Sequence, residues 1–494
     1  MSVAQWVVRT LATPAISRCL TGRPSDLQRL LRLERIAPRN HVLSAFLRRL
    51  DHDIQERSGL GALLVHVGRS ANPRQKRTLI KDLFFNWMVT GTQTRRRLRS
   101  LDYWVPFFIV ISPTMRCNLK CAGCYSALYS KDGELSEAEL DRILSECRRL
   151  GIHLVVISGG EPYLLSGTLL RLFAKYRDIF FLTFTNGTLL DEPLVAALAR
   201  SGNVAPALSV EGFQEHTDRR RSPGVYAQIE RAMELLRRYR VIFGISVTYT
   251  RENVDLVTDD AFVEHYSRSG ALFAWYFMFM PVGKDPILDL VPTPEQRVRC
   301  GQRVEQLRKR YPMFMADFWN DGPAVGGCLA GGRRYLHILN SGRVEPCVYA
   351  HFGVDNIRDT SLLDAANSPF FRAIRREFPF NDSANLRRPC LIVDNPQVLR
   401  RLVNEYVVPG GHVHADEIVS HPSVVRWVDE YAERMEQLTE QEWQQKIENP
   451  ASRWYRHGDE YKLLFRFKDT TPAPGPNAVR ASTSEYREST RVQR

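Results

Sequence analysis

Apolar runs bounded by turn residues recur through the middle of the chain. They lie at 106–112, 153–159, 179–185, 205–210, 241–249 and 271–279. Runs of this length are typical of buried strands, and helix-like segments separate them. Strands that alternate with helices predict βα units and a parallel sheet, so we expect an α/β fold.

One of the intervening segments carries the signals of a helix at both ends. Ser136 and Glu139 stand three residues apart, as in a capping box, and Gly151 follows at the position of a C-terminal cap. The residues between them are apolar at helical spacing: Leu140, Ile143, Leu144, Cys147 and Leu150. We therefore expect Cys147 in the core. Cys300 lies on a similar apolar face and should be buried as well.

Three cysteines lie within eight residues, in the run MRCNLKCAGCYS: Cys117, Cys121 and Cys124. Three thiolates on one short loop suit a four-iron, four-sulfur cluster with one iron open to a small molecule, because a four-cysteine cluster leaves no iron open. A zinc knuckle is the main alternative, but zinc sites favour paired C-x2-C arms, and no second C-x2-C exists. Nine cysteines without an evident secretory signal indicate a reducing compartment rather than disulfides.

A second motif follows the cysteines at the end of a predicted strand. The run HLVVISG leads into the tetrad Gly159-Gly160-Glu161-Pro162. Glycines let the backbone approach a ligand closely, and a carboxylate suits a charged amino group. Together with the cysteine spacing, this tetrad resembles the radical S-adenosylmethionine (SAM) enzymes, over about residues 105–285.

The resemblance implies a partial (β/α)6 barrel of the TIM type, with a [4Fe-4S] cluster on the three cysteines and SAM as the cofactor. In that family one electron from the cluster cleaves the carbon–sulfur bond of SAM. The resulting 5′-deoxyadenosyl radical takes hydrogen from the substrate, so the chemistry belongs to the cofactor. No catalytic side chain beyond the cluster is expected.

The same resemblance places several residues at the cofactor, in strand-to-helix turns that would otherwise be ordinary ones. Glu161 should meet the amino group of SAM, Ser209 and Glu211 (in ALSVEG) the ribose hydroxyls, and Val247 the adenine. Ligands gather at the carboxyl ends of parallel strands, where these turns lie. The full expected set is Tyr125, Gly159, Gly160, Glu161, Asn186, Ser209, Glu211 and Val247.

A second sulfur site is expected downstream. Its ligands would be Cys328, Cys347 and Cys390. Cys347 closes a predicted hairpin, in which YLHIL and RVEPC flank the turn Asn340-Ser341-Gly342. This arrangement is similar to the auxiliary-cluster extension, of the SPASM or twitch type, of many radical SAM enzymes. The alternative is three unrelated core thiols.

The auxiliary site departs from the family pattern, which has more cysteines than the three found here. A fourth ligand could be Asp394, His351, Cys300 or the substrate, or the cluster could be absent. His412 and His414, in GGHVHAD, could also ligate a metal, although an H-x-H in a glycine-rich loop is more often a solvated turn.

A chain of 494 residues exceeds the usual size of a single core. We expect a basic helical module at 1–100, a radical SAM core at 101–290 and a SPASM/twitch-like auxiliary domain at 291–400. A helical C-terminal region should follow at 401–467. The tail at 468–494 is rich in Pro, Ser, Thr and Arg and should be disordered.

Positive charge is concentrated at one end of the chain. Residues 1–100 hold 19 Lys+Arg and 6 Asp+Glu, whereas the remaining residues hold 49 of each sign. The apolar run LIKDLFFNWMVTG (79–91) precedes four arginines, at 95–97 and 99. Aromatic and basic side chains together suit an anionic membrane surface, where each cation adds about 1 kcal/mol of attraction. A solvated helical face is the alternative, and nucleic acid is not expected as a partner.

The apolar runs are too short to span a bilayer. The first 25 residues lack acidic side chains and imitate a mitochondrial presequence, but the start of an amphipathic helix explains them equally well. We expect a cytoplasmic protein, with peripheral membrane attachment as an option, and an electron donor such as flavodoxin or ferredoxin.

The basic module joined to a radical generator favours a lipid substrate, with hydrogen taken from an unactivated alkyl carbon for modification or coupling. The alternative is peptide or protein maturation, the commonest role of SPASM-type relatives, although residues 1–100 show no winged-helix pattern for leader binding. A non-catalytic iron–sulfur scaffold is the third option. The GGEP and SVEG segments argue against it, because a scaffold needs no SAM pocket.

Overall fold

Within the described part of the chain, ten strands form one sheet in the order β10-β9-β8-β1-β2-β3-β4-β5-β6-β7. Strands β1 to β7 are parallel, β8 pairs in parallel with β1, and β9 and β10 are antiparallel to their neighbours. The strands are Ile109–Ile111 (β1), Leu154–Ile157 (β2), Phe180–Thr185 (β3), Val204–Val210 (β4), Gly244–Tyr249 (β5), Phe273–Met278 (β6), Phe314–Asp317 (β7), His337–Ile338 (β8), Arg343–Glu345 (β9) and Asp355–Asn356 (β10).

The computed structural model describes residues 21–23, 25–32, 59–282 and 286–448, with isolated positions at 16, 48 and 51. Residues 1–445 group into one unit and residues 446–494 into a second. The predicted disordered tail and most of the first 58 residues lie outside the described residues. Among the described helices, none combines the length and the apolarity that crossing a bilayer requires.

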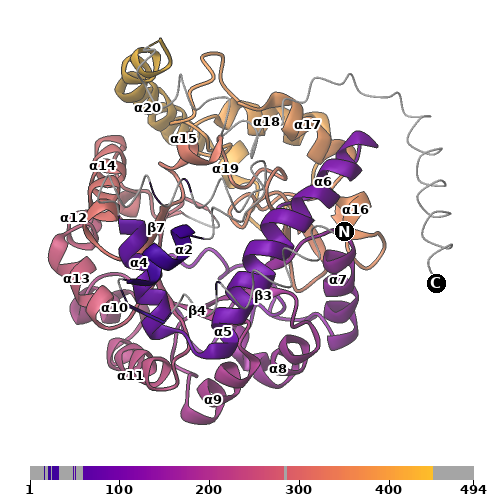
Figure 1. The fold of residues 1–494 in the computed structure, drawn as a ribbon. Coiled ribbons are helices and arrows are strands. Elements are labelled where there is room, and N and C mark those ends of the chain that lie inside the picture. The colour runs from indigo at the N-terminus through magenta and orange to yellow at the C-terminus, as the bar shows by residue number, and fades with distance from the viewer. Residues whose placement is uncertain are drawn as a thin grey trace. The chain divides into compact units, whose positions relative to one another are not determined.

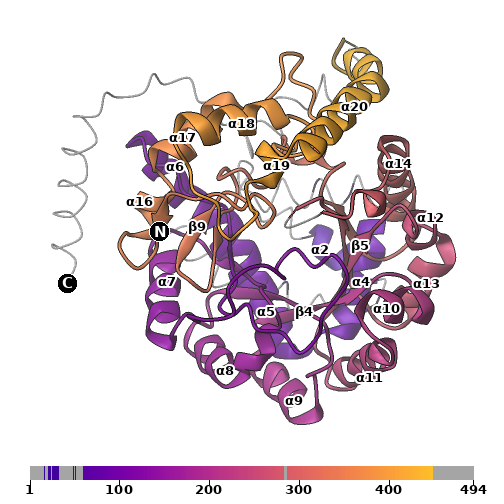
Figure 2. The same ribbon diagram turned by 180° about the vertical axis from the view of Figure 1, so that it is seen from behind.

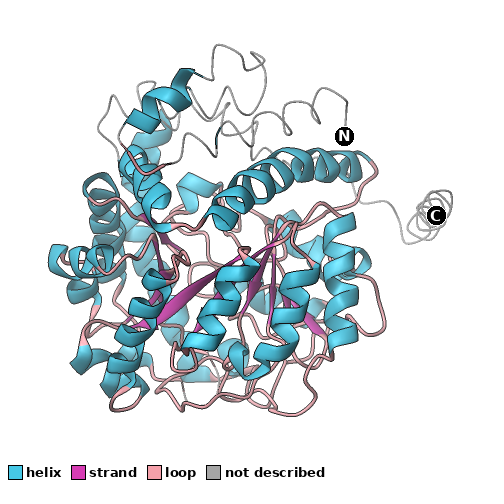
Figure 3. Cartoon of the chain, turned by 60° about the horizontal axis from the view of Figure 1, so that its bottom comes forward, coloured by secondary structure: helices cyan, strands magenta, loops and turns pink. Residues whose placement is uncertain are grey.

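The predicted α/β fold is confirmed. Each of the six predicted runs coincides with one of the strands β1 to β6, and β4 begins one residue before its run. Helices surround the strands, as in a partial TIM-type barrel (Figures 1 and 3). The outer helices are α7 (Glu137–Arg149), α8 (Ser166–Lys175), α9 (Glu192–Ser201), α10 (Gln214–Arg221), α11 (Val225–Arg238), α12 (Val254–Val257), α13 (Asp260–Arg268) and α14 (Pro294–Arg310).

Strand β7 was not expected from the sequence. Its segment, FMAD, is four residues long, begins with the exposed Phe314 and ends with the buried Asp317. It therefore lacks the long apolar run by which a buried strand is recognised. Its pairing with β6 extends the parallel part of the sheet by one strand.

The predicted capping box starts α7. The Ser136 side chain accepts a hydrogen bond from the backbone N–H of Glu139, and the Glu139 carboxylate accepts one from the backbone N–H of Ser136 at 2.7 Å. Gly151 follows with φ +73°, which favours glycine. Cys147 and Cys300 are both buried, as expected.

Helices from the N-terminal segment cover the amino ends of the barrel strands. The Gln75 side chain donates to the carbonyl of Val204, where β4 begins, and accepts from the backbone N–H of Ile242, just before β5. Figure 1 shows α5 and α6 crossing this face of the barrel. The elements of this segment are α2 (Ser25–Arg32), α4 (Gly59–Ser70), α5 (Pro73–Thr78), the π-helix η2 (Leu79–Thr90) and α6 (Gly91–Ser100).

The predicted hairpin around Gly342 is present as β8 and β9, with His337 opposite Glu345. Because β8 pairs with β1, this hairpin continues the barrel sheet. The four boundaries between the five predicted domains stay a prediction. The remaining elements are η3 (Pro162–Leu165), η4 (Leu288–Leu290), α15 (Gly322–Val325), α16 (Leu362–Ala365), α17 (Pro369–Glu377), α18 (Pro396–Glu405), α19 (Glu417–Ser420) and α20 (Pro422–Glu448).

Candidate active site

The loop with the three cysteines follows β1 and crosses the opposite end of the barrel, seen in Figure 2. The Cys117 sulfur accepts a backbone hydrogen bond at 3.4 Å, the Cys121 sulfur lies 3.9 Å from Arg221 Nη1, and the Cys124 sulfur lies 3.2 Å from Ser126 Oγ. Burial raises the pKa of the Cys117 and Cys121 thiols, so each needs a cationic partner to ionise. Iron supplies such a partner, and the donor set fits a cluster.

These cysteines border a cavity of about 860 Å³ at the carboxyl ends of the strands. Small-molecule sites in proteins range over roughly 300–1,000 Å³, and parallel sheets place them at this edge. Eight of the predicted site residues line the cavity: Cys117, Cys121, Cys124, Tyr125, Gly159, Gly160, Asn186 and Ser209.

The glycine pair lies against the base of the cysteine loop. A Cβ on Gly160 would collide with the carbonyl oxygen of Arg116, and one on Gly159 would collide with that of Thr114. The backbone N–H of Gly160 donates to the Thr114 carbonyl at 3.0 Å, and that of Glu161 donates to the Arg116 carbonyl at 2.8 Å. The glycines therefore permit close packing of two backbone segments, which holds the cysteine loop over the cavity.

Glu161 is not among the residues that line the cavity, and its contact with the amino group of SAM stays a prediction. Its side chain is fully buried. The carboxylate accepts hydrogen bonds from Tyr163 N at 3.1 Å, Thr185 Oγ1 at 2.8 Å and Asn186 N at 2.8 Å. Glu161 thus positions Asn186, whose side chain does line the cavity.

The buried position of Glu161 predicts a pH-dependent stability. Burial raises the pKa of its carboxyl from 4.5 to about 7, although three hydrogen bonds oppose the change. The pKa of Glu161 is higher in the folded than in the unfolded protein. Its contribution to the free energy of unfolding is therefore complete below pH 4.5 and is lost as the pH rises through 7. The Glu161→Gln variant should lose this dependence, worth about 3 kcal/mol.

The measurement is the apparent midpoint of urea unfolding at pH 5 and pH 8, for both proteins. Glu215→Gln, on the exposed side of α10, is the matched control and should behave as the parent. An equal change in midpoint for the parent and Glu161→Gln would contradict the prediction.

Glu211 was expected at the ribose, and the structure gives it other partners. Its carboxylate oxygens accept from Arg220 Nη1, Arg221 Nε and Arg221 Nη2, all at 2.6 Å. Burial opposes ionisation, but the two guanidinium groups outweigh it and lower the pKa of Glu211. Because Arg221 also approaches Cys121, Glu211 serves to orient a cation beside the cysteine loop.

The side chain of Val247 does not line the cavity, and its contact with the adenine stays a prediction. Ser246 and Thr248 line the cavity, and Val247 between them is fully buried on the other face. Side chains alternate between the two faces of a strand, so Val247 lies on the face opposite to these two hydroxyls. Two hydroxyl groups in an otherwise apolar strand were the signal that sequence reasoning missed.

The fold brings the three downstream cysteines together. Burial first, and then the proximity of Cys390 and Cys347, raise the pKa of Cys328. The Cys347 sulfur lies 3.3 Å from Tyr335 Oη, and the Cys390 sulfur accepts from a backbone N–H at 3.4 Å. These cysteines do not line the cavity.

As placed, the described His, Cys, Asp and Glu side chains form no set of three that could hold a single metal ion. In a cluster each thiolate binds a different iron, so a cluster does not require three ligands to converge on one point. The described side chains therefore form no site for a single zinc ion as placed, and they remain compatible with a cluster.

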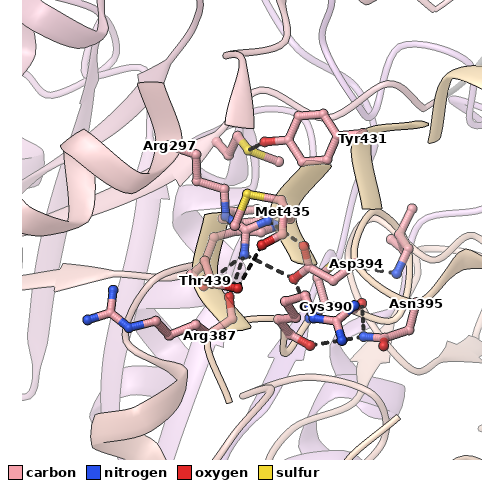
Figure 4. Close-up of polar contacts among 12 residues, drawn as sticks. Arg297, Arg387, Cys390, Asp394, Asn395, Tyr431, Met435 and Thr439 are labelled. Atoms are coloured by element: carbon pink, nitrogen blue, oxygen red, sulfur yellow. Dashed lines mark hydrogen bonds and ion pairs between the residues drawn. The ribbon is translucent and has the colours of Figure 1, made fainter. Parts of the chain in front are cut away.

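Asp394 was a possible fourth ligand, but its carboxylate is already bound. Arg297 Nη1 and Nη2 donate to its two oxygens at 2.5 and 3.0 Å, and the backbone N–H of Cys390 donates at 2.9 Å (Figure 4). Both side chains of this ion pair are fully buried. Asp394 therefore fixes the backbone of Cys390 instead of offering a free oxygen.

The other proposed ligands also have partners of their own. His351 Nδ1 lies 2.8 Å from His412 Nε2, and burial lowers the pKa of His351 to about 3. His414 pairs with Glu417 at 2.9 Å, so the two histidines of the H-x-H do not face one site. Cys300 lies 3.6 Å from Asp317, in the barrel core.

Arg333 supplies buried positive charge beside the downstream cysteines. It is 6% exposed and donates to the carbonyls of Cys328 at 3.0 Å and Gly326 at 3.2 Å. Within the described residues, no carboxylate forms an ion pair with it. Buried charges are normally compensated, and three thiolates with an iron–sulfur cluster would supply negative charge there. The residues present fit an auxiliary cluster.

In the basic and aromatic stretch at 79–99, the side chains of Trp87 and Arg95 pack against the barrel. Trp87 Nε1 donates to the carbonyl of Phe107 at 2.7 Å, and the two rings lie 4.3 Å apart. Arg95 is 6% exposed, donates to the Gly151 carbonyl at 2.9 Å and lies over the Phe107 ring. These side chains are already used in packing, which differs from the prediction that they meet a membrane.

Comparison with known protein families assigns both regions. Residues 111–263 match the family described as the radical SAM superfamily, and residues 328–391 match SPASM, described as an iron-sulfur cluster-binding domain. The chain is a radical SAM enzyme with a SPASM domain. Its cofactors are therefore SAM, a [4Fe-4S] cluster and an additional iron–sulfur group in the SPASM domain.

Curated relatives of this radical SAM enzyme include three types of protein. An AdoMet-dependent heme synthase of Methanosarcina barkeri is 25% identical over 59% of this chain and 90% of the relative. A PqqA peptide cyclase of Gluconobacter oxydans is 28% identical over 55% of this chain and 79% of the relative. The mycofactocin maturase MftC of Mycolicibacterium smegmatis is 31% identical over 50% of this chain and 62% of the relative.

Solved structures are also similar to this radical SAM enzyme. Streptococcus suis SuiB bound to the precursor peptide SuiA aligns with a TM-score of 0.49 and 18% identity, over 62% of this chain and 72% of that one.

Proposed function

We propose that this radical SAM enzyme modifies a peptide or protein by removing a hydrogen atom from one of its carbons. The observation that carries the proposal is the union of a radical SAM core and a SPASM domain in one chain, with two kinds of peptide-modifying enzyme among its relatives. This was the alternative reading of the sequence, and it now replaces the lipid reading.

The lipid hypothesis depended on residues 1–100 as a membrane-binding module beside the active site. The described helices of that segment cover the amino ends of the strands, whereas the cavity opens at the carboxyl ends. Trp87 and Arg95 are bound to the barrel. No lipid enzyme stands among the relatives described above, so we place a lipid substrate second.

Several residues of the cavity can be given a role under this proposal. Cys117, Cys121 and Cys124 would hold a [4Fe-4S] cluster, which together with SAM supplies the one-electron chemistry that generates a radical. The side chain of Asn186 and the hydroxyls of Ser209, Ser246 and Thr248 face the cavity and would bind polar groups of SAM. Arg221, held by Glu211, would stabilise the Cys121 thiolate.

The auxiliary cysteines would hold the second cluster, with Asp394 and Arg297 fixing Cys390. Under the proposal this cluster exchanges electrons with the substrate or with an external donor, for which flavodoxin or ferredoxin remains the expectation. The boundaries at 100, 290, 400 and 467 are proposed as before.

The test is a comparison of a deletion strain with its complemented parent, by profiling of peptides, lipids and tetrapyrroles. We expect a mass change in a peptide, restored by the parent gene and not by a Cys117→Ala gene. A restored change confined to lipids, or to tetrapyrroles, would contradict the peptide assignment. Purified enzyme with dithionite and SAM should release 5′-deoxyadenosine.

A further inference from the structure

The two sides of the active-site cavity differ in chemistry. One part of the lining, from the loops and strands β2 to β5, carries small polar groups, among them Ser158, Ser209, Ser246 and Thr248, beside the apolar Val156, Leu182 and Phe184. The opposite side is formed by β6 and by segments next to β1, β7, β8 and β9. It is lined by six aromatic rings: Phe108, Trp275, Phe277, Phe318, Tyr335 and Tyr349. We call these six residues the aromatic compartment.

The rings of the aromatic compartment form a connected surface. Phe277 lies at its centre, with its ring centroid 6.2 Å from that of Trp275 and 5.3 Å from that of Phe318. Tyr335 lies 6.2 Å from Phe318, and Phe108 lies 5.1 Å from Tyr335. Four segments distant in the sequence thus build one aromatic wall, and the Phe184 ring of β3 adjoins it at 5.5 Å from that of Phe277.

One polar group on this part of the wall, the hydroxyl of Tyr335, is directed away from the cavity. The hydroxyl of Tyr335 lies 3.3 Å from the sulfur of Cys347, an auxiliary-cluster cysteine that does not line the cavity. The Tyr349 ring packs between Tyr125, at 5.4 Å, and Trp319, at 5.5 Å. The compartment therefore offers ring surface and few hydrogen-bonding groups.

Charged side chains border the cavity only on the side of the cysteine loop. Every charged residue of the lining is basic: Arg116, Lys120, Lys131, Arg220 and Arg221. They belong to the cysteine loop and to the end of α10, where they surround the thiols. No aspartate or glutamate among the described residues lines the cavity. A cation in the aromatic compartment would meet ring faces but no carboxylate among the described lining residues, and the basic residues that could pair with an anion belong to the cysteine loop and α10.

We infer that the aromatic compartment receives an uncharged apolar side chain of the substrate, aliphatic or aromatic, and that this side chain donates the hydrogen atom. The inference deepens the proposed function and rests on it, because the side chain is taken to belong to a peptide. Apolar surface is favourably removed from water against these rings, whereas a Lys, Arg, Asp or Glu side chain would be desolvated there without an oppositely charged side chain on the wall.

Continuity of the cavity places this compartment beside the radical source. The same cavity contains the cysteine loop, the glycine pair and the six rings. A side chain seated against Phe277 and Trp275 lies in the same enclosed space as the expected SAM site. Bound SAM and a bound side chain would therefore share it, which is what hydrogen transfer requires.

The experiment follows deuterium from defined probes into 5′-deoxyadenosine. Reconstituted full-length enzyme is mixed with dithionite, SAM and one probe whose side chain is deuterated. The probes are the N-acetyl amides of leucine, phenylalanine, lysine and glutamate, with perdeuterated octanoate as an alkyl chain that is not a peptide. Mass spectrometry measures the deuterium in the product.

The reaction balances for every probe. Dithionite supplies one electron, the bond between sulfur and the 5′ carbon of SAM breaks, and methionine leaves. The 5′-deoxyadenosyl radical forms its carbon–deuterium bond as that bond of the probe breaks. The probe radical then takes a second electron from dithionite and a proton from water.

The inference expects at least tenfold more deuterium from the leucine or phenylalanine amide than from the lysine or glutamate amide. Equal transfer from the charged probes, transfer from octanoate alone, or 5′-deoxyadenosine without deuterium from any probe would overturn it. Absence of 5′-deoxyadenosine would instead overturn the proposed function, and the inference with it.

A variant pair makes the test specific to the compartment. Phe277→Glu places a carboxylate at the centre of the wall and should reduce transfer from leucine at least tenfold while raising transfer from lysine. Leu101→Glu changes an exposed residue at the end of α6 that does not line the cavity, and it should leave the preference unchanged. Probe-free formation of 5′-deoxyadenosine verifies that both variants are folded. A preference unaltered by Phe277→Glu would overturn the inference.

Discussion

Replacing Cys117 with alanine should abolish SAM cleavage and remove the iron of the radical SAM cluster. Cys117, Cys121 and Cys124 come from one loop and line one cavity, and no fourth thiol among the described residues lines it. A cluster left with two protein thiolates would not be retained. We expect the yield of 5′-deoxyadenosine to fall by at least ~10³-fold, because groups that act as a unit lose function together.

The matched control for this variant is Cys147→Ala. Cys147 is a buried core thiol on α7, and its replacement removes the same atom without touching the cavity. It should lower stability modestly and retain iron and cleavage. The measurements are iron and sulfide per chain, the electron paramagnetic resonance signal of the reduced cluster, and product yield. Full cluster content in Cys117→Ala would contradict the assignment of Cys117 as a ligand of the radical SAM cluster.

The second large effect concerns stability and the auxiliary site. Arg297→Met should leave the Asp394 carboxylate buried without its cation, since both side chains are fully buried and paired at 2.5 Å. Breaking a buried pair by removing one partner costs about 3–5 kcal/mol. Because Asp394 also accepts the N–H of Cys390, the auxiliary cluster should be lost more readily than the first.

The double variant Arg297→Met with Asp394→Leu distinguishes charge burial from loss of volume. Replacing a buried ion pair by apolar residues is often neutral, so the double variant should recover much of the lost stability. It should not recover auxiliary iron, because the contact to Cys390 is gone. Unfolding by urea and iron counting measure the two effects separately. A single variant as stable as the parent would contradict the role of the pair.

Sequence patterns predicted the local features of this enzyme. The cysteine loop, the glycine pair and the Gly342 hairpin each depend on neighbours within a few residues, so spacing and residue type were sufficient. The six strands of the core also followed from local apolar runs. Strand β7 did not, because its pairing with β6 rather than its own pattern makes it a strand.

The contacts expected of Glu161, Glu211 and Val247 at the cofactor stay predictions, and the sequence did not show their partners in the fold. The carboxylates of Glu161 and Glu211 accept hydrogen bonds from Thr185 and Arg221, which are distant from them or lie on another element. Val247, which was expected at the adenine, lies between Ser246 and Thr248, which line the cavity. A carboxylate in a motif does not reveal whether it faces a ligand or a neighbouring side chain.

The substrate reading changed for a similar reason. Aromatic and basic residues at 79–99 suggested a membrane surface, and in the fold Trp87 and Arg95 bind the backbone at Phe107 and Gly151. Amphipathic composition is the same whether the apolar face meets lipid or protein. Only the position of the barrel distinguishes the two.

The amino-acid order was enough to establish the class of chemistry, since three thiols on one short loop and a glycine pair are arranged by adjacent residues. The folded arrangement decided which side chains reach the cavity, which carboxylates pair with arginines, and where the aromatic compartment lies. Those features join β1, β6, β7 and the SPASM segment, which are far apart in the chain, and contacts of that kind leave no periodic trace in the sequence.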